Sequence, residues 1–416
     1  MKRSASLDFL RGAAAFAVAV PHYLTADAPF RPGVEAVAVS AVEVFFVLSG
    51  FVLAPQIVDW VVGRPWRNLG VFLARRWMRT IPPYVAALAV VALMTGNLFT
   101  ADTLRYLFYV ENLFRSANAV DFYPVAWSLA VEEWFYVLFA PLLFLLARAL
   151  GRSDRRLDVA FAALFILAFA ALRTFGAPSD WDLNVRRVTV FRIDSIVWGF
   201  LLYLLLERRP LFGLKTVAGR RALVALGAAL VLAAALEYGA AMLALEGVRS
   251  AQLAFPWASA LFGVAAVGFF REAGGLLEGP RLAALGFYFG RISYSAYLFH
   301  IALAMALKPL IGGWPLGVQL ALYVAAICAV STLFWRGFER PILAARPDYR
   351  PRPRSPVAFE AGAPPRAPTR GWRLATIALG LAFAAAATGT RNAFMANEPW
   401  RGRDLARPIL LVETPV

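Results

Sequence analysis

An arginine and a histidine lie eleven positions apart, at Arg11 and His22, in a segment that is otherwise apolar enough to cross a membrane. At about 100° and 1.5 Å per residue, eleven steps place both side chains on one helix face, roughly 16 Å apart. Either group would cost several kcal/mol if it faced lipid, so both are expected to face a protein interior or a wet cavity. There the pair would mark a functional site or a transport pathway. The plainer alternative is a snorkelling arginine and an interfacial histidine.

The elements that hold these residues are long apolar helices. The chain has 416 residues, 60% hydrophobic and 16% charged, with a mean hydropathy of +0.63. This composition argues against a soluble single-core protein and predicts an all-α, polytopic integral membrane protein. The first segment is expected to remain as a helix and not to be cleaved as a signal peptide, because Arg11 lies inside it. Segments long enough to span a membrane occur at 7–24, 37–58, 81–99, 125–147, 157–175, 188–206, 221–243, 251–270, 292–312, 315–335 and 372–390.

These segments predict four regions along the chain. A helical block covers residues 1–341, a Pro- and Arg-rich linker covers 342–371, one more span covers 372–390, and a short tail covers 391–416. The linker lacks helical periodicity and is expected to be an extended or disordered tether beside anionic lipid. The connection over 100–124 is rich in aromatic residues, and it either covers a substrate or lies at the membrane interface.

The basic residues are distributed unevenly between the two predicted sides of the membrane. The larger share of the 42 Lys and Arg falls on the N-terminus and on every second loop, which places those parts in the cytoplasm. The N-terminus is therefore expected inside and the tail outside. A net charge of +16 that is spread over successive loops is a topogenic signal, and it argues against a nucleic-acid partner.

This topology assigns a depth to the remaining intramembrane polar residues. His22 and several other groups fall near the outer end of their spans, and these others are Glu43, Glu132, Glu133, Arg192 and Asp194. Arg11 and His300 fall in the inner half, where a third segment begins with Arg75, Arg76 and Arg79. The sequence thus predicts a cluster of arginines at the cytoplasmic end of the bundle and a cluster of carboxylates with His22 nearer the outer end.

Each element also has a purely structural interpretation. Arg192 and Asp194 could form an internal ion pair, Glu132 could bond another helix, and Trp127 could anchor an interface. Ser49 lacks the pattern around a nucleophilic serine. No Cys or His spacing indicates a metal site, and the single cysteine, Cys328, is expected to be a packing residue.

Seven motifs in order give the chain a family resemblance. It resembles the acyltransferase 3 family, whose members O-acylate, most often O-acetylate, cell-envelope and exported carbohydrates. The resemblance covers roughly residues 5–341 and implies a ten-helix core, to which the chain adds an eleventh C-terminal span. The motifs are LDFLRG followed by His22, EVFFVLSGF, RRWMRTIPPY, WSLAVEEWFY, RIDSIVWG, ISYSAYLFH and the closing ERP at Glu339–Pro341.

The resemblance also implies roles for residues. Arg11 and His22 match the family's essential pair, and Glu132 matches the acidic residue of the WSL motif, in which Trp127 and Ser128 also lie. Acyl-CoA, most simply acetyl-CoA, is the implied co-substrate, with no permanently bound cofactor. The implied acceptor is a hydroxyl of a carbohydrate or glycolipid, and the implied location is a bacterial inner membrane.

A mechanism follows as a hypothesis. The nucleotide end of acetyl-CoA is polyanionic, so Arg75, Arg76 and Arg79 could hold its phosphates while the pantetheine arm passes Arg11. His22 could then take the proton of an acceptor hydroxyl, with Glu132 holding its tautomer. An acyl-histidine intermediate is equally compatible with these residues.

Other interpretations and two departures from the family pattern bear on this hypothesis. His300 is expected to line the donor channel or to pack in the core. Pro21 directly precedes His22 and would kink or end the helix there. Residues 391–416 are too few for the external domain that some relatives carry after an eleventh span. The rival functions are a transporter or flippase for a glycan or acyl donor and a scaffold subunit without catalysis.

Overall fold

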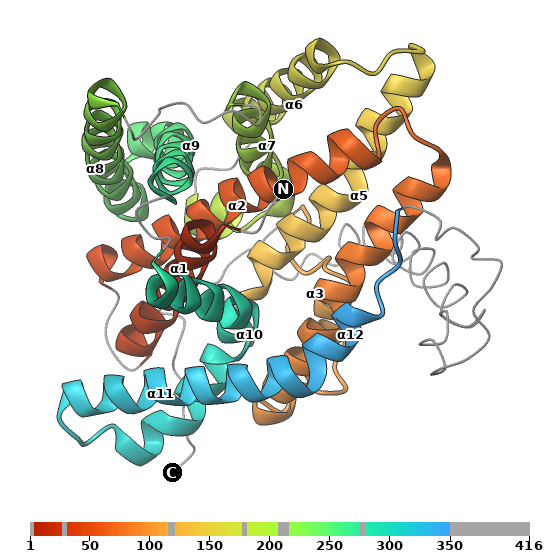
Figure 1. The fold of residues 1–416 in the computed structure, drawn as a ribbon. Coiled ribbons are helices and arrows are strands. Elements are labelled where there is room, and N and C mark those ends of the chain that lie inside the picture. The colour runs from red at the N-terminus through yellow and green to blue at the C-terminus, as the bar shows by residue number, and fades with distance from the viewer. Residues whose placement is uncertain are drawn as a thin grey trace.

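The computed structural model describes residues 4–26, 31–114, 121–176, 181–206, 216–274 and 279–349. All elements in these ranges are helical (Figure 1). The long helices are α1 Ala5–Thr25, α2 Pro32–Trp60, α3 Trp66–Met94, α5 Ala126–Ala149, α6 Arg155–Gly176, α7 Asp194–Leu206, α8 Val217–Leu245, α9 Arg249–Glu272, α10 Pro280–Ile311 and α11 Leu316–Phe334. The short ones are α4 Ala101–Leu107, η1 Asp182–Arg186, η2 Thr189–Phe191, η4 Trp335–Glu339 and α12 Arg340–Ala344.

The structure is that of an all-α, polytopic membrane protein. Nine helical stretches among the described residues are long and apolar enough to cross a membrane. Helix α1, which carries Asp8, Arg11 and His22, is not among these nine. Each of the ten spans predicted up to residue 335 overlaps one of the long described helices. The eleventh predicted span, most of the linker and the tail lie outside the described residues.

Two helices begin much earlier than the hydropathy pattern predicts. Helix α3 begins at Trp66 instead of residue 81, and α10 begins at Pro280 instead of residue 292. The added turns carry arginines and glycines, which lower the hydropathy of a segment without preventing a helix. The depth that the sequence assigns to residues of α10 is therefore wrong by about three turns.

Proline and glycine mark where several helices begin and end. Pro32 and Pro280 lie in the first turn of α2 and α10, where a missing N–H costs no helical hydrogen bond. Gly63 after α2 and Gly151 after α5 have φ of 67° and 59°, a left-handed conformation that glycine adopts without steric cost. Pro21 neither ends nor interrupts α1, which continues to Thr25, so Arg11 and His22 lie on one continuous helix.

Helices α1 and α10 form the most extensive helix pair in the described structure. Small residues allow this approach: a Cβ on Gly286 would lie 2.4 Å from the carbonyl oxygen of Ala5, and one on Gly290 would lie 2.4 Å from Cβ of Asp8. In a membrane, where lipid is as apolar as leucine, such close van der Waals packing is a main source of helix association. This pairing sets the two histidine-bearing helices side by side.

Helices α2 and α7 approach each other through a second pair of glycines. A Cβ on Gly50 would lie 1.8 Å from the carbonyl oxygen of Ile196, and one on Gly199 would lie 1.8 Å from that of Val47. Because both obstacles are backbone atoms, a larger residue can be accommodated only if the helices separate.

We expect Gly50→Ala to destabilise the protein, because the added methyl group forces α2 and α7 apart. Overpacking of this kind costs about 1–3 kcal/mol. The matched control is Gly268→Ala in α9, where an added Cβ meets no atom within 4 Å. Thermal unfolding in detergent should show a lowered midpoint for Gly50→Ala alone. A midpoint equal to that of the control would contradict the close contact.

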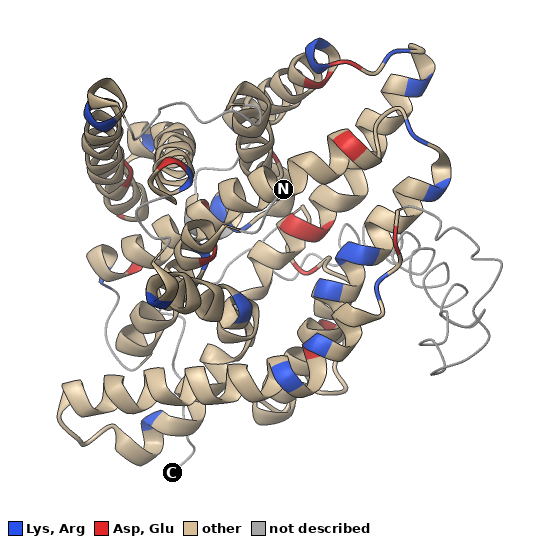
Figure 2. Cartoon of the chain, viewed as in Figure 1, with Lys and Arg blue, Asp and Glu red and all other residues tan. Residues whose placement is uncertain are grey.

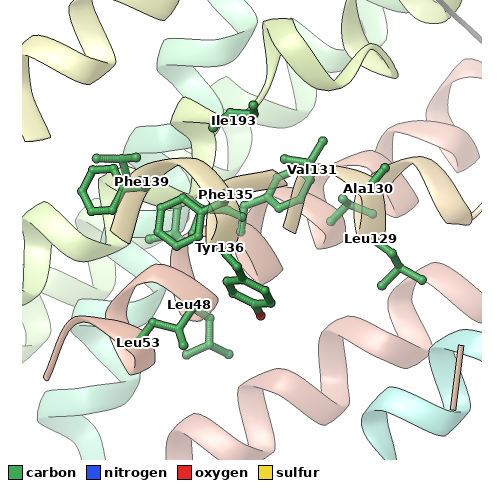
Figure 3. Packing of buried hydrophobic residues seen from close by; sticks show 14 of the residues in the cluster. Leu48, Leu53, Leu129, Ala130, Val131, Phe135, Tyr136, Phe139 and Ile193 are labelled. Carbon is green, nitrogen blue, oxygen red and sulfur yellow. The ribbon is translucent and has the colours of Figure 1, made fainter. Parts of the chain in front are cut away.

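Aromatic and aliphatic side chains fill the space between α2, α5 and α7. Figure 3 shows Val131, Phe135 and Phe139 of α5 together with Leu48 of α2 in this cluster. Phe139 contacts the ring of Phe200 in α7, with 4.9 Å between ring centroids. These contacts fix the rotation of α5, and with it the direction of the polar residues on its other face.

Candidate active site

The two histidines of the chain meet in the structure. Nδ1 of His22 in α1 lies 2.9 Å from Nε2 of His300 in α10, and the two ring planes are within 3° of parallel. The sequence placed His300 in the inner half of its span, away from His22, and that prediction is wrong. Because α10 begins at Pro280, His300 lies well along the helix and reaches the level of His22 near the end of α1.

Neighbouring groups hold His300 in place. Its Nδ1 lies 2.6 Å from the carbonyl oxygen of Tyr297, one turn earlier in α10. The hydroxyl of Tyr323 in α11 donates to the carbonyl oxygens of His300 at 2.9 Å and Ala19 at 3.3 Å, which ties α11 to both histidine-bearing helices. His300 is fully buried, whereas His22 is partly exposed. Of the two residues, His22 is therefore the more accessible to a substrate.

A pocket lies between α1, α2, α3, α5 and α10. Its charged lining is one acidic residue and three basic ones: Glu132, Arg11, Arg76 and Arg79. Ser128 and Tyr297 line the same pocket, and their hydroxyl groups are 2.6 Å apart. Neither histidine is among the lining residues, but Tyr297 binds His300 through its carbonyl oxygen, so the pocket and the histidine pair share a neighbour. An excess of positive charge around such a pocket suits an anionic ligand.

Two of the lining arginines have partners within the protein. Arg76 is buried and donates from Nη2 to the side-chain oxygen of Gln56 at 2.8 Å. Arg11 contacts the carboxylate of Asp8 at 3.4 Å, one turn earlier in α1. These contacts orient the two guanidinium groups within the pocket lining, and Nε of Arg76 has no hydrogen-bond partner among the described residues.

Arg75 does not line this pocket, although the sequence groups it with Arg76 and Arg79. Its Nη1 donates to the carbonyl oxygen of Pro347 at 2.7 Å and lies 3.7 Å from the carboxylate of Asp348. Its guanidinium also lies over the ring of Tyr349, 5.4 Å from the centroid. Arg75 therefore binds the protein's own chain just after α12.

Residues 345–349, which we call the strap, lie against the basic part of α3, where Figure 2 shows several Lys or Arg along the helix. Arg67 donates to the carbonyl oxygens of Asp348 and Tyr349, and the ring of Tyr349 stacks on Trp60. Burial and the nearby arginines of α3 lower the pKa of Arg346 to about 10. The start of the predicted linker is thus a packed segment that adds another cation to this end of the bundle.

Glu132 has a different partner from the one predicted for it. It accepts a hydrogen bond from the hydroxyl of Tyr136, one turn later in α5, and it lines the arginine-rich pocket. Among the described residues, the hydrogen-bond partner of His22 is His300 and not Glu132. Ser128, one turn before Glu132, lies nearer the level of the histidines, because it bonds Tyr297. The carboxylate is therefore a group of the pocket.

The arrangement so far combines an imidazole pair with a basic pocket inside a bundle of membrane helices. The sequence profile of the acyltransferase domain of the acyltransferase 3 family matches residues 4–336. The chain belongs to the acyltransferase 3 family. Every element of the site described above, apart from the strap, lies inside the matched region.

Known relatives of this acyltransferase 3 protein share short regions with it. It is 30% identical over 128 residues to the O-acetyltransferase OatA of Staphylococcus aureus, which covers 27% of this chain and 21% of OatA. It is 28% identical over 183 residues to an uncharacterized protein of Haemophilus influenzae, which covers 38% of this chain and 72% of that protein. Six other S. aureus proteins match over 39% of this chain, and the chain spans only 29% of their length. No solved structure matches the chain.

Three intramembrane charges that the sequence places beside His22 belong to a separate network in this acyltransferase. Arg192, fully buried, forms an ion pair with Glu43 of α2, and Ser259 of α9 donates to the same carboxylate at 3.3 Å. Asp194 pairs with Arg173 of α6 through two hydrogen bonds, at 2.9 and 3.0 Å. The suggested Arg192–Asp194 pair is therefore wrong, since each of the two residues binds a group on another helix. These pairs join α2, α6, α7 and α9.

Trp127 connects the acyltransferase site to residues that the sequence did not single out. The guanidinium of Arg186 lies over its ring at 5.2 Å from the centroid, and Arg187 forms an ion pair with Asp121 at 3.7 Å. A signal for them exists in the sequence: two adjacent arginines in a loop that the charge pattern places outside run against the positive-inside rule.

Asn112 fastens the connection after α4 to the segment that carries these arginines. Its side chain donates to the carbonyl oxygens of Arg187 and Trp127 and accepts from the hydroxyl of Thr189. Tyr109 to Asn112 are buried, so this part of the connection packs into the bundle and does not lie at its surface. The backbone of Tyr109 has a positive φ of 55°, and Trp134 donates to its carbonyl oxygen at 2.9 Å.

Proposed function

We propose that this protein transfers an acetyl group from cytoplasmic acetyl-CoA to a hydroxyl of a carbohydrate or glycolipid on the other side of a bacterial inner membrane. The observation that carries the proposal is the pocket that Arg11, Arg76, Arg79 and Tyr297 line together, because Tyr297 also binds His300 of the histidine pair. One continuous site can then hold a polyanionic donor at one end and activate a hydroxyl at the other.

The donor end is the one that holds the arginines. Acetyl-CoA carries phosphates at its nucleotide end and a thioester at the end of a thin pantetheine arm. Arginine is well suited to phosphate, because its planar group donates two parallel hydrogen bonds. The N-terminus of α1 and the arginine-rich start of α3 lie on the cytoplasmic side in this proposal, as the distribution of basic residues favours.

The acceptor end is the one that holds His22. A neutral imidazole can take the proton of a hydroxyl while its oxygen attacks the thioester carbon. Arg186 and Trp127 lie near this end, and aromatic rings and guanidinium groups commonly contact sugars or their anionic substituents. OatA, whose name describes an O-acetyltransferase, supports the same class of reaction.

Membrane vesicles of opposite orientation test the proposal. Inverted vesicles expose the cytoplasmic face, and labelled acetyl-CoA added to them should place label in the envelope glycan or glycolipid. Sealed right-side-out vesicles should incorporate little, because acetyl-CoA does not cross the membrane. Equal incorporation by wild type and by His22→Ala would overturn the catalytic assignment. Glycan movement without acylation would favour a transporter.

Arg79→Ala is expected to weaken donor binding without abolishing transfer. A charge-assisted hydrogen bond contributes about 1.5–3 kcal/mol, so the apparent KM for acetyl-CoA should rise about 10- to 100-fold. Arg64→Ala is the matched control, since Arg64 is an exposed arginine near the start of α3 that donates to the backbone of Asp59. A KM that rises equally in both variants would show that the effect is one of overall charge.

A further inference from the structure

We infer that His300 is a positioning residue that fixes the tautomer of His22, so that Nε2 of His22 is the atom that accepts the hydroxyl proton. This inference rests on the proposed function and adds a residue to its mechanism. The evidence is a chain of two hydrogen bonds that runs from the carbonyl oxygen of Tyr297 through His300 to His22.

The direction of the first bond follows from its acceptor. The carbonyl oxygen of Tyr297 can only accept, and Nδ1 of His300 lies 2.6 Å from it. Two unprotonated acceptors at that distance would repel each other, so Nδ1 of His300 carries a hydrogen. A neutral imidazole holds one N–H, and Nε2 of His300 is therefore an acceptor.

The second bond then has one possible direction. Nε2 of His300 accepts, so Nδ1 of His22, 2.9 Å away, carries the hydrogen and donates it. The lone pair of His22 is left on Nε2, the nitrogen that does not face His300. The same logic operates in catalytic triads, where the group bound to Nδ1 decides which nitrogen acts as the base.

Burial assigns the two roles to the two rings. His300 is fully buried and lies between His22, Tyr297 and the α11 residue Tyr323. A charged His300 would need a carboxylate, and its hydrogen-bond partners among the described residues are an imidazole and a backbone carbonyl. His22 is partly exposed and can meet a substrate. His22 is therefore the base, and His300 acts through it.

In this mechanism the proton of the acceptor hydroxyl passes through His22 to the sulfur of the leaving group. The acceptor O–H bond breaks and its proton moves to Nε2 of His22, while the oxygen forms a bond to the thioester carbon. The C–S bond then breaks and the sulfur leaves with the electron pair. The imidazolium returns its Nε2 proton to that sulfur, which gives free CoA. Throughout, Nδ1–H of His22 remains donated to His300, which helps to stabilise the imidazolium.

Three variants in inverted vesicles test the inference, with labelled acetyl-CoA as donor and the endogenous envelope glycan as acceptor. His300→Leu removes the acceptor for Nδ1 of His22, and the maximal rate should fall about 100-fold, within the range that a general base contributes. The apparent KM for acetyl-CoA should stay within about twofold, because the pocket is intact. His300→Gln places an amide oxygen near the former Nε2. Its maximal rate should be at least about tenfold higher than that of His300→Leu.

The control is Tyr288→Phe. It removes a hydroxyl of α10 that lies 3.0 Å from Oγ1 of Thr332 in α11, and it leaves both histidines and their hydrogen-bond partners in place. This variant should lower the thermal midpoint in detergent and retain the maximal rate per folded protein. If His300→Leu transfers acetyl groups at the wild-type rate while His22→Ala does not, the inference fails and the proposed function stands. If wild type itself transfers no acetyl group, the proposed function fails.

Discussion

Alanine at His22 is expected to lower the rate of acetyl transfer about 10³-fold, with unchanged amounts of protein in the membrane. General base catalysis contributes about 10²–10⁴-fold, and His22 is the partly exposed member of the histidine pair. Its removal also leaves His300 without the ring to which it is hydrogen-bonded. The measurement is the initial rate of label transfer from acetyl-CoA to envelope glycan in inverted vesicles.

A control close to His22 separates chemistry from helix stability. Thr25→Ala removes a hydroxyl that donates to the carbonyl oxygen of Pro21 at 3.0 Å, one turn from the histidine. It should retain most of the activity. Imidazole added at high concentration should restore part of the rate of His22→Ala, because the lost side chain leaves room for it. If His22→Ala keeps more than a tenth of the wild-type rate without added imidazole, His22 is not the base.

The helices of this protein were largely predictable from the sequence, because a long apolar segment is recognisable from its hydropathy alone. The arginines of the basic pocket were also identifiable, since Arg11, Arg76 and Arg79 each lie in or beside such a segment. What connects them is helix packing, which depends on glycines such as Gly290 and Gly50 whose contacts lie on other helices. Their positions in the sequence do not reveal which helix they face.

The position of His300 shows the limit most clearly. Hydropathy located the apolar part of α10 but not its first three turns, so the depth assigned to the histidine was wrong. The same limit applies to Arg192, whose partner Glu43 lies 149 positions away. Pairing of buried charges across helices is a property of the assembled bundle, and local spacing suggested Asp194 instead.

The observed positions of the carboxylates change the mechanism expected for His22. The carboxylates expected beside His22 serve elsewhere: Glu43 and Asp194 hold helices together, and Glu132 lines the basic pocket. His22 therefore depends on a neutral partner instead of an acidic one. A neutral partner fixes the tautomer without placing a second charge in the membrane, where each uncompensated charge is costly.

Removing one member of the buried pair between Arg192 and Glu43 is expected to destabilise the bundle strongly. Arg192→Met leaves the carboxylate of Glu43 buried, with the hydroxyl of Ser259 as its remaining described partner. Breaking a buried ion pair in this way costs about 3–5 kcal/mol. The unfolding midpoint in detergent should fall steeply, and the amount of protein that reaches the membrane should fall with it.

The double variant Glu43→Leu with Arg192→Met decides whether the loss comes from the unpaired charge. Replacing both partners with apolar residues removes the uncompensated charge, so the double variant should be more stable than Arg192→Met alone. Asp154→Asn, at an exposed ion pair with Arg152 between α5 and α6, should leave the midpoint unchanged. If the double variant is less stable than Arg192→Met and less stable than Glu43→Leu, the two side chains are not coupled as the structure indicates. Recovery of stability together with transfer activity would place this network outside the catalytic machinery, as a brace that holds α2 against α7 and α9.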